Sequence, residues 1–343
     1  MKKLLSRPNQ EAVPLVLPAI MTEAPRGVKT ALVAGMDFSF IRLDITNVSS
    51  NKRNVKKEGK TEGEKLFQGL MVLLKDNFPP NEIESEPQYR RYFSDPCAAD
   101  WFVDVAVDNS GKVIGASLYS YSRQMNLAML NIVAVDKDSR QQGVASALMA
   151  RTIERSNRVS LETCGRGIDY IMAEIESLDP SITGAEGRMI NHVRPAFHDN
   201  TTLIRAIRLQ DGSAFTYLLP IMASDQERAE AEKAGEPFEA EPLMFCLRPI
   251  SKDEKDGISS REVAKLLIWF YKDYLEAECS DMRREEVNEL LSITLSKLSG
   301  GIAPERFMAF LEKGPKQRSG AIELVPEVKL DFVKIAESGS AAS

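Results

Sequence analysis

The stretch that decides the fold runs from Asn131 to Arg158 and reads NIVAVDKDSRQQGVASALMARTIERSNR. Its first five residues form a short apolar run, and the next segment, DKDSRQQG, is polar and typical of a turn. After the turn, apolar residues recur at helical spacing at Val144, Ala147, Leu148 and Ile153. The stretch therefore predicts a strand, a tight loop and a helix, in that order.

The loop before this helix has the features of an anion-binding site. The first amide groups of a helix have no acceptor within the helix, and the positive end of the helix dipole lies behind them. Gly143 lets a ligand approach the backbone because it has no Cβ, Ala145 keeps the next turn small, and Arg140 adds a positive charge. These features predict a site that suits a pyrophosphate.

The segment from Arg140 to Ala145, RQQGVA, resembles the acetyl-CoA signature Q/R-x-x-G-x-G/A of the GNAT superfamily of N-acetyltransferases. The resemblance implies acetyl-CoA as the cosubstrate, and we expect no metal, since the sequence has only two histidines. It also implies that the loop amides hold the CoA pyrophosphate and that the preceding strand pairs with the pantetheine arm. The cofactor-binding residues implied in this way are Ile132, Val133, Ala134, Val135, Arg140, Gln141, Gln142, Gly143, Val144, Ala145 and Ser146.

The pattern is loose by itself, and the alternative is an ordinary strand-to-helix turn. Its surroundings favour the family. Trp101 to Val107 and Val113 to Tyr121 predict a hairpin, and Leu127 to Val135 predicts the third antiparallel strand. Ile168 to Ile175 predicts a buried strand, which the family places parallel to the signature strand and splayed from it. We therefore expect an α/β (α+β) protein with the GNAT acyltransferase fold: a mixed, mostly antiparallel central sheet flanked by helices.

Three segments are expected. Residues 1–60 hold an amino-terminal strand, placed near Asp37 to Thr46, and a flexible stretch. Residues 61–250 form the GNAT acetyl-CoA-binding catalytic domain, in which apolar stripes predict helices over Glu62 to Lys75 and around Gln88 to Phe93. The aromatic residues of the second helix are expected in the core more than in an acceptor wall. Pro242 to Pro249 is expected to close the sheet.

Residues 251–343 predict a carboxy-terminal helical extension. Ser259 and Glu262 form a capping box, and a wide apolar face then continues to Leu275. Further helices are expected from Asp281 and from Pro304. These helices must bury their apolar faces, and packing against the sheet is favoured over the interface of a homodimer.

Acetyl transfer to an amine needs a base for the ammonium proton, a donor for the thioester oxyanion and an acid for the leaving thiolate. Glu174 is the candidate base because the alternation in AEIE places it, with Glu176, on the strand face beside the expected cleft. Desolvation there would raise the pKa of its carboxyl. The alternative is a salt-bridged carboxylate at a strand end. Tyr217 and His198 are the candidate acids.

The predicted function is an acetyl-CoA-dependent N-acetyltransferase that moves an acetyl group to a primary amine by direct attack. The acceptor is expected to be a small-molecule amine or a peptide amine. A catalytically inactive GNAT-fold module that binds CoA or regulates another protein is the alternative. It is suggested by Arg188 to Asn200, where the family's phrase F-Y-x-x-x-G-F is missing and Phe197-His198 stands in its place.

Composition excludes several other classes. The formal charge of -6 argues against general nucleic-acid binding, which needs clustered Lys and Arg. The four cysteines have no C-x-x-C spacing, which predicts reduced thiols, with Cys164 and Cys246 in the core, and a cytoplasmic location. Two histidines make a His-based metal cluster improbable, and no apolar run is long enough to cross a membrane.

Overall fold

The computed structural model describes residues 19–22, 30–33, 38–43, 62–78, 83–94, 99–176, 204–220, 225–235, 241–251, 254–278 and 283–333. Their strands form a twelve-stranded sheet in the order β1-β2-β3-β4-β5-β6-β7-β10-β8-β12-β11, with β9 also paired to β10. The strands are β1 (Ala19–Thr22), β2 (Thr30–Val33), β3 (Phe38–Arg42), β4 (Asp100–Asp108), β5 (Val113–Ser122), β6 (Leu127–Val135), β7 (Tyr170–Glu176), β8 (Arg205–Arg208), β9 (Thr216–Leu219), β10 (Glu241–Pro249), β11 (Ile258–Ser259) and β12 (Lys329–Val333).

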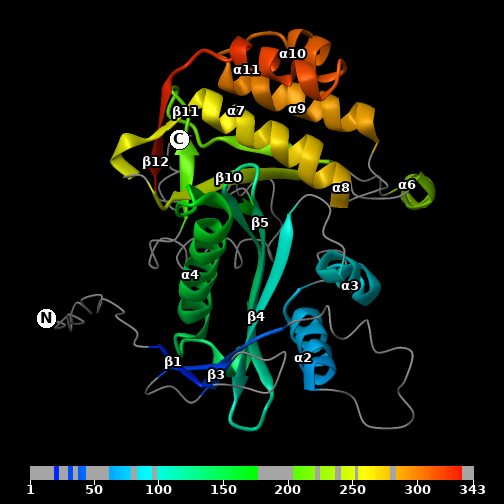
Figure 1. Ribbon diagram of the computed structural model, residues 1–343. Coiled ribbons are helices and arrows are strands. Elements are labelled where there is room, and N and C mark those ends of the chain that lie inside the picture. Colours follow the sequence, from blue (N-terminus) through cyan, green and yellow to red (C-terminus); the bar gives the residue numbers. More distant parts are fainter. Residues whose placement is uncertain are drawn as a thin grey trace, which may run out of the picture.

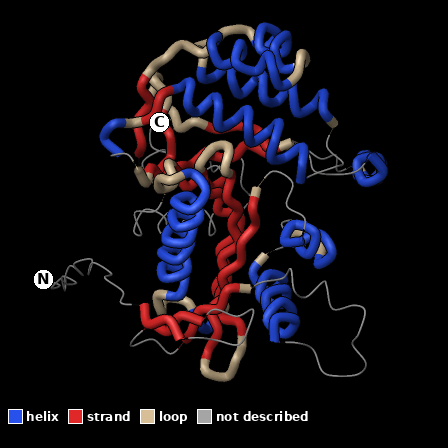
Figure 2. Tube along the Cα trace, in the orientation of Figure 1, coloured by secondary structure: helices blue, strands red, loops and turns tan. Residues whose placement is uncertain are grey.

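Helices cover both faces of this sheet. Among the described residues these are α2 (Glu62–Asn77), α3 (Glu86–Ser94), α4 (Val144–Cys164), α6 (Asp225–Ala234), α7 (Ser260–Trp269), the π-helical turn η5 (Phe270–Leu275), α8 (Glu276–Glu278), α9 (Arg284–Leu298), α10 (Pro304–Leu311) and α11 (Arg318–Leu324). Figure 1 shows α4 on one side of β4 and β5, with α2 and α3 on the other. Figure 2 shows the strands running through the middle of the molecule between these helices. The mixed α/β fold with a mostly antiparallel sheet is confirmed.

The central hairpins follow the expected strands closely. Strands β4, β5 and β6 pair antiparallel in sequence order, while β6 and β7 form a parallel pair. Helix α4 connects β6 to β7, as expected of a crossover between parallel strands. These strands are buried along most of their length rather than on alternate residues, because helices cover both faces of the sheet here. The aromatic residues of α3 are core residues, and the ring of Tyr92 stacks on Trp101 at 4.7 Å between centroids.

The carboxy-terminal segment is joined to the sheet. Its helices α7 and α9 share one hydrophobic core with Tyr217 and Phe245 of the sheet, so their apolar faces are buried within the chain. Strand β12 pairs with β8 through Phe332 and Ile207. The prediction that Pro242 to Pro249 closes the sheet is therefore wrong, because β10 lies inside it. The short run KLDFV was too brief to predict β12, and pairing with β8 stabilises it.

The predicted cap of α7 is confirmed, since the Ser259 hydroxyl accepts a hydrogen bond from the Glu262 amide at 3.2 Å. Two other local features differ from the predicted pattern. The apolar stripe does not continue as one α-helix to Leu275, however, because a π-helical turn follows Trp269. At the amino terminus, β1 and β2 add two paired strands that were not predicted, since nearby prolines interrupt their apolar runs.

A buried ionic group holds α4 against the central strands. The Asp104 side chain is fully buried on β4, and Arg155 of α4 donates to its Oδ1 at 2.6 Å. The hydroxyl of Tyr119 donates to the other carboxylate oxygen at 3.0 Å. A buried charge that loses its partner is strongly destabilising. The position of α4 therefore depends on this group.

We expect Asp104→Ala to lower the free energy of unfolding by about 3–5 kcal/mol, because it leaves the Arg155 guanidinium buried without its counter-charge. Urea unfolding followed by circular dichroism measures the change. Asp100→Ala is the control, because Asp100 pairs with an exposed partner, Arg123, and surface pairs contribute only ~0–1 kcal/mol. Equal, small changes in both variants would show that the buried group does not hold α4.

Candidate active site

Strands β6 and β7 separate partway along their length. Their parallel pairing runs from Leu127 with Tyr170 to Leu130 with Ala173 and ends there, although both strands continue. The β6 edge from Asn131 to Val135 has no strand partner on the β7 side among the described residues. A strand edge of this kind offers free amide and carbonyl groups to an extended ligand. The prediction that these strands are parallel and diverge is confirmed.

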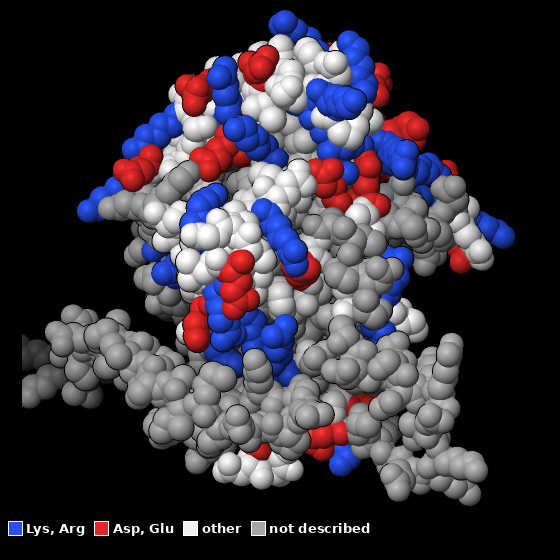
Figure 3. Space-filling model, in the orientation of Figure 1, with Lys and Arg blue, Asp and Glu red and all other residues white. Residues whose placement is uncertain are grey.

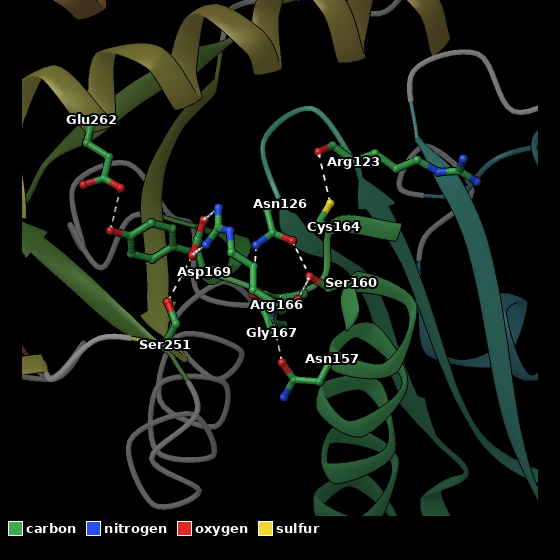
Figure 4. Close-up of polar contacts among 12 residues, drawn as sticks. Arg123, Asn126, Asn157, Ser160, Cys164, Arg166, Gly167, Asp169, Ser251 and Glu262 are labelled. Carbon is green, nitrogen blue, oxygen red and sulfur yellow. Dashed lines mark hydrogen bonds and ion pairs between the residues drawn. The ribbon is translucent and has the colours of Figure 1, made fainter. Parts of the chain in front are cut away.

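The opposite end of the two strands is fastened by polar contacts (Figure 4). Asn126, which precedes β6, donates to the carbonyl of Gly167 at 2.9 Å and accepts from Ser160 of α4. Asp169, which precedes β7, pairs with Arg166 and accepts from Ser251 at 3.0 Å. Because these contacts close one end, the strands can separate only toward the loop that leads into α4.

That loop has the backbone geometry expected of an anion cradle. Gly143 is the N-cap residue of α4, with φ of 81°, and no side chain caps the helix. Gln141 has φ of 64°, which is uncommon for a residue other than glycine and marks strain held by the surrounding structure. Within the described part of the chain, no side chain accepts a hydrogen bond from the amides of the first helical turn, which suit an anion.

The side chains of the predicted cofactor residues lie in several environments. Ile132 packs toward the α2 side of the sheet and Val133 toward the α4 side, so both present only backbone to the free edge. Val144 is buried in the core, and only its amide is available. Arg140 is exposed and donates to the Asn77 side chain at 2.9 Å. Gln141, Gln142 and Gly143 are exposed, Ala134 is buried, and Val135, Ala145 and Ser146 are half-buried.

Charged side chains of both signs lie in this loop, where Lys137 and Arg140 stand beside Asp136 and Asp138. Figure 3 shows a cluster of Lys and Arg side chains, with Asp and Glu side chains beside it, on the face of the molecule that carries α4. Opposite charge close to a phosphate strengthens its binding, most of all at low salt. The residues present therefore suit the pyrophosphate and the extended arm of CoA.

Glu174 lies where β6 and β7 part. It is the first residue of β7 beyond the last paired residue, Ala173, and faces Phe245 of β10 across the sheet. Its side chain is half-buried, but the Oε1 atom is inaccessible and has no hydrogen-bond partner among the described residues. Burial raises the pKa of the Glu174 carboxyl to about 8. No ion pair joins it to a described residue, so the salt-bridge alternative is not supported.

The raised pKa has a consequence for stability. A carboxyl with a pKa of about 8 in the folded chain and 4.5 when unfolded contributes fully to stability below pH 4.5, and that contribution is lost as the pH rises through 8. Such a shift corresponds to roughly 5 kcal/mol. We expect Glu174→Gln to become more stable than the wild type as the pH rises from 5 to 9. Urea unfolding across this range measures the difference, and a constant difference would contradict the burial of the charge.

The other catalytic candidates have different outcomes. Tyr217 lies in β9, and its hydroxyl is buried without a hydrogen-bond partner among the described residues. Its ring packs edge-on against Phe245 and Tyr271, at 5.8 and 5.9 Å between centroids. Tyr217 and Glu174 therefore flank Phe245 on one face of the sheet. His198 and the side chain of Glu176 lie outside the described residues.

Two tyrosines near the site were not predicted as functional residues. Tyr271 and Tyr274 of η5 were expected only as part of an apolar face. The Tyr271 hydroxyl donates to the carbonyl of Leu218, and Tyr274 accepts from Asn131 Nδ2 at 2.8 Å. A buried tyrosine needs a hydrogen-bond partner where a leucine does not. The sequence therefore held one signal for these two residues: a tyrosine on an otherwise apolar helix face indicates a polar contact within the core.

One prediction about the cysteines is wrong. Cys246 is buried, as expected, but Cys164 is exposed at the end of α4. A hydrogen bond from Tyr121 lowers the pKa of the Cys164 thiol, with help from Thr163 and two nearby arginines. The expectation failed because the helix ends at this residue and turns its last side chain toward solvent. Among the described residues, no group of three or more His, Cys, Asp or Glu side chains is placed to hold a metal ion.

Residues 67–165 match the Acetyltransferase (GNAT) family, a span that covers α2 to the end of α4 and includes the loop and the free edge of β6. This segment is therefore similar to a GNAT acetyltransferase domain. No curated protein matches the chain. None of the helices in the described part is long and apolar enough to cross a membrane.

Several solved structures are similar. A GNAT family N-acetyltransferase from Escherichia coli in complex with CoA shares 20% identity over 34% of this chain and 59% of its own, with a TM-score of 0.26. The ribosomal-protein-S18-alanine N-acetyltransferase from Escherichia coli shares 13% identity over 57% of this chain and 94% of its own, with a TM-score of 0.33. The IAA acetyltransferase from Bacillus cereus ATCC 14579 shares 11% identity over 52% of this chain and 91% of its own, with a TM-score of 0.30.

Proposed function

We propose that this protein is an acetyl-CoA-dependent N-acetyltransferase that acts on a primary amine. The observation that carries the proposal is the end of β6–β7 pairing at Leu130 and Ala173, with a free strand edge leading to an uncapped helix and a buried carboxyl at the same point. The family match over residues 67–165 supports acetyl transfer.

Two backbone segments of the chain would bind different parts of CoA. The free β6 edge from Asn131 to Val135 would pair with the amides of the pantetheine arm, and the first-turn amides of α4 would hold the pyrophosphate. Gly143 leaves the backbone of this turn open. Acetyl-CoA supplies the activated acyl group when it is bound.

Glu174 is the proposed general base. It must remove a proton from the acceptor's ammonium group before the nitrogen lone pair can attack the thioester carbonyl. A carboxyl with a pKa of about 8 is a stronger base than an ordinary glutamate once it is ionised. A backbone amide near Val135 is the proposed donor for the oxyanion, and Tyr217 is the proposed acid for the thiolate. The homodimer and the cytoplasmic location stay predictions.

The test measures release of the CoA thiol from acetyl-CoA with a panel of primary amines and amino-terminal peptides. We expect at least one amine to release thiol faster than water does, with one N-acetyl product formed for each thiol. The alternative function, a CoA-binding module without turnover, predicts micromolar binding of CoA and no release with any amine. Absence of both binding and release would contradict both functions.

A further inference from the structure

The π-helical turn η5 brings the carboxy-terminal extension to the point where the two central strands part. Tyr274 of this turn contacts Asn131 of β6, and the ring of Tyr271 packs against Tyr217 of β9 at 5.9 Å between centroids. Burial raises the pKa of the Tyr271 hydroxyl, and the negative charge of Glu174 raises it further. A π-helical turn is rare and is often found at functional sites. The extension therefore reaches β6 at the point where its pairing with β7 ends.

Asn131 is the residue at which β6 changes its pairing on both edges. Toward β5, Leu118 pairs with Ile132 and Tyr119 pairs with Leu130, so Asn131 is the extra residue of a β-bulge. Toward β7, the last pair is Leu130 with Ala173, so Asn131 is also the first residue of the free edge. The conformation of Asn131 thus decides how β6 leaves β7.

The Asn131 side chain is held from two sides. Its Nδ2 donates to the Tyr274 hydroxyl at 2.8 Å, and its Oδ1 accepts from the Ser120 hydroxyl at 3.4 Å. Ser120 belongs to the neighbouring strand β5, whereas Tyr274 comes from the extension. The Tyr274 contact therefore joins two segments that lie 143 residues apart in the chain.

Tyr274 is itself rigidly placed. Only 3% of it is exposed, and its ring lies 5.5 Å from Trp269 and 5.8 Å from Phe270 between centroids. The ring of Trp101 in β4 also stacks on Tyr274, at 6.4 Å between centroids. A hydroxyl held by this much packing is a fixed anchor for the bulge, because the ring cannot follow a shift of Asn131 without leaving the core.

We propose that Tyr274 is a positioning residue for acetyl transfer: by holding Asn131 at the bulge, it sets the separation of β6 and β7 and so the shape of the CoA groove. The inference rests on the proposed function. It gives the carboxy-terminal extension a part in the site that the family match, which ends at residue 165, does not cover.

Tyr274→Phe tests the inference because it removes the hydroxyl and keeps the ring. A hydrogen bond of this kind contributes about 0.5–1.5 kcal/mol, so we expect CoA to bind roughly three- to tenfold more weakly in calorimetric titration. Tyr170→Phe is the matched control. It removes another hydroxyl contact with the extension, to Glu262 at 2.8 Å, at the paired end of β7. Its CoA affinity should equal that of the wild type.

A merely structural role for Tyr274 predicts that CoA affinity follows the melting temperature in both variants. The inference predicts similar melting temperatures and a loss of affinity in Tyr274→Phe alone. Asn131→Ala should weaken binding to a similar degree, and the double variant should bind about as well as either single variant. Wild-type affinity in Tyr274→Phe would overturn the inference and leave the proposed function standing. Failure of the wild type to bind CoA would overturn both.

Discussion

Glu174→Gln is expected to lower the rate of acetyl transfer by about 10²- to 10⁴-fold, the usual contribution of a general base. The amide keeps the size of the side chain but cannot accept the ammonium proton. CoA affinity should stay within about twofold of the wild type, because the proposed pyrophosphate and pantetheine contacts come from the backbone of other residues. Steady-state kinetics with a substrate amine and titration with CoA measure the two effects separately.

The pH dependence of the wild type supports or contradicts the same role. With a pKa of about 8 the Glu174 carboxyl is mostly protonated at neutral pH, so turnover should rise with pH and level off above 8. Glu154→Gln is the control, because Glu154 is exposed on α4 and should give wild-type rates. A Glu174→Gln enzyme with the wild-type rate and pH profile would remove Glu174 from the mechanism.

Gly143→Glu is expected to weaken CoA binding by at least about 100-fold. The new carboxylate would stand at the N-cap of α4, beside the proposed pyrophosphate, and two like charges 4 Å apart repel by about 4 kcal/mol near a protein surface. The left-handed backbone at this position adds about 1–3 kcal/mol of strain for any residue with a Cβ. Calorimetric titration with CoA measures the loss.

Gly143→Gln separates charge from strain. Glutamine has the same size and meets the same left-handed backbone, but it carries no charge. We expect it to bind CoA more weakly than the wild type and at least tenfold more tightly than Gly143→Glu, with the gap narrowing as salt is added. Equal affinities in the glutamate and glutamine variants would show that no anion lies at this loop.

Much of the fold could be predicted because the signals were local. The apolar runs of β4 to β6, bounded by turn residues, and the helical spacing that begins at Val144 can be recognised in short windows of sequence, and the structure follows them within a few residues. Strand β12 and the π-helical turn after Trp269 could not be predicted. The first depends on pairing with β8, and the second on packing against the sheet, and neither leaves a local pattern.

The candidate site also contains residues that local sequence patterns identify and a contact that they do not. Gly143 and Glu174 could be chosen from the sequence, the first from a loop motif and the second from strand alternation beside it. The contact between Asn131 and Tyr274 could not, because it joins residues 143 positions apart and needs the completed fold. The prediction that Cys164 is buried was wrong because cysteine is usually a core residue, and the sequence did not show that α4 ends at this position.

The measurement that tests the account most directly is a crystal structure of the protein with acetyl-CoA. We expect the pantetheine arm between the β6 edge at Asn131 to Val135 and the diverging end of β7, with the pyrophosphate against the first turn of α4 and the thioester beside Glu174. Acetyl-CoA bound elsewhere, with the β6 edge left bare, would contradict the account.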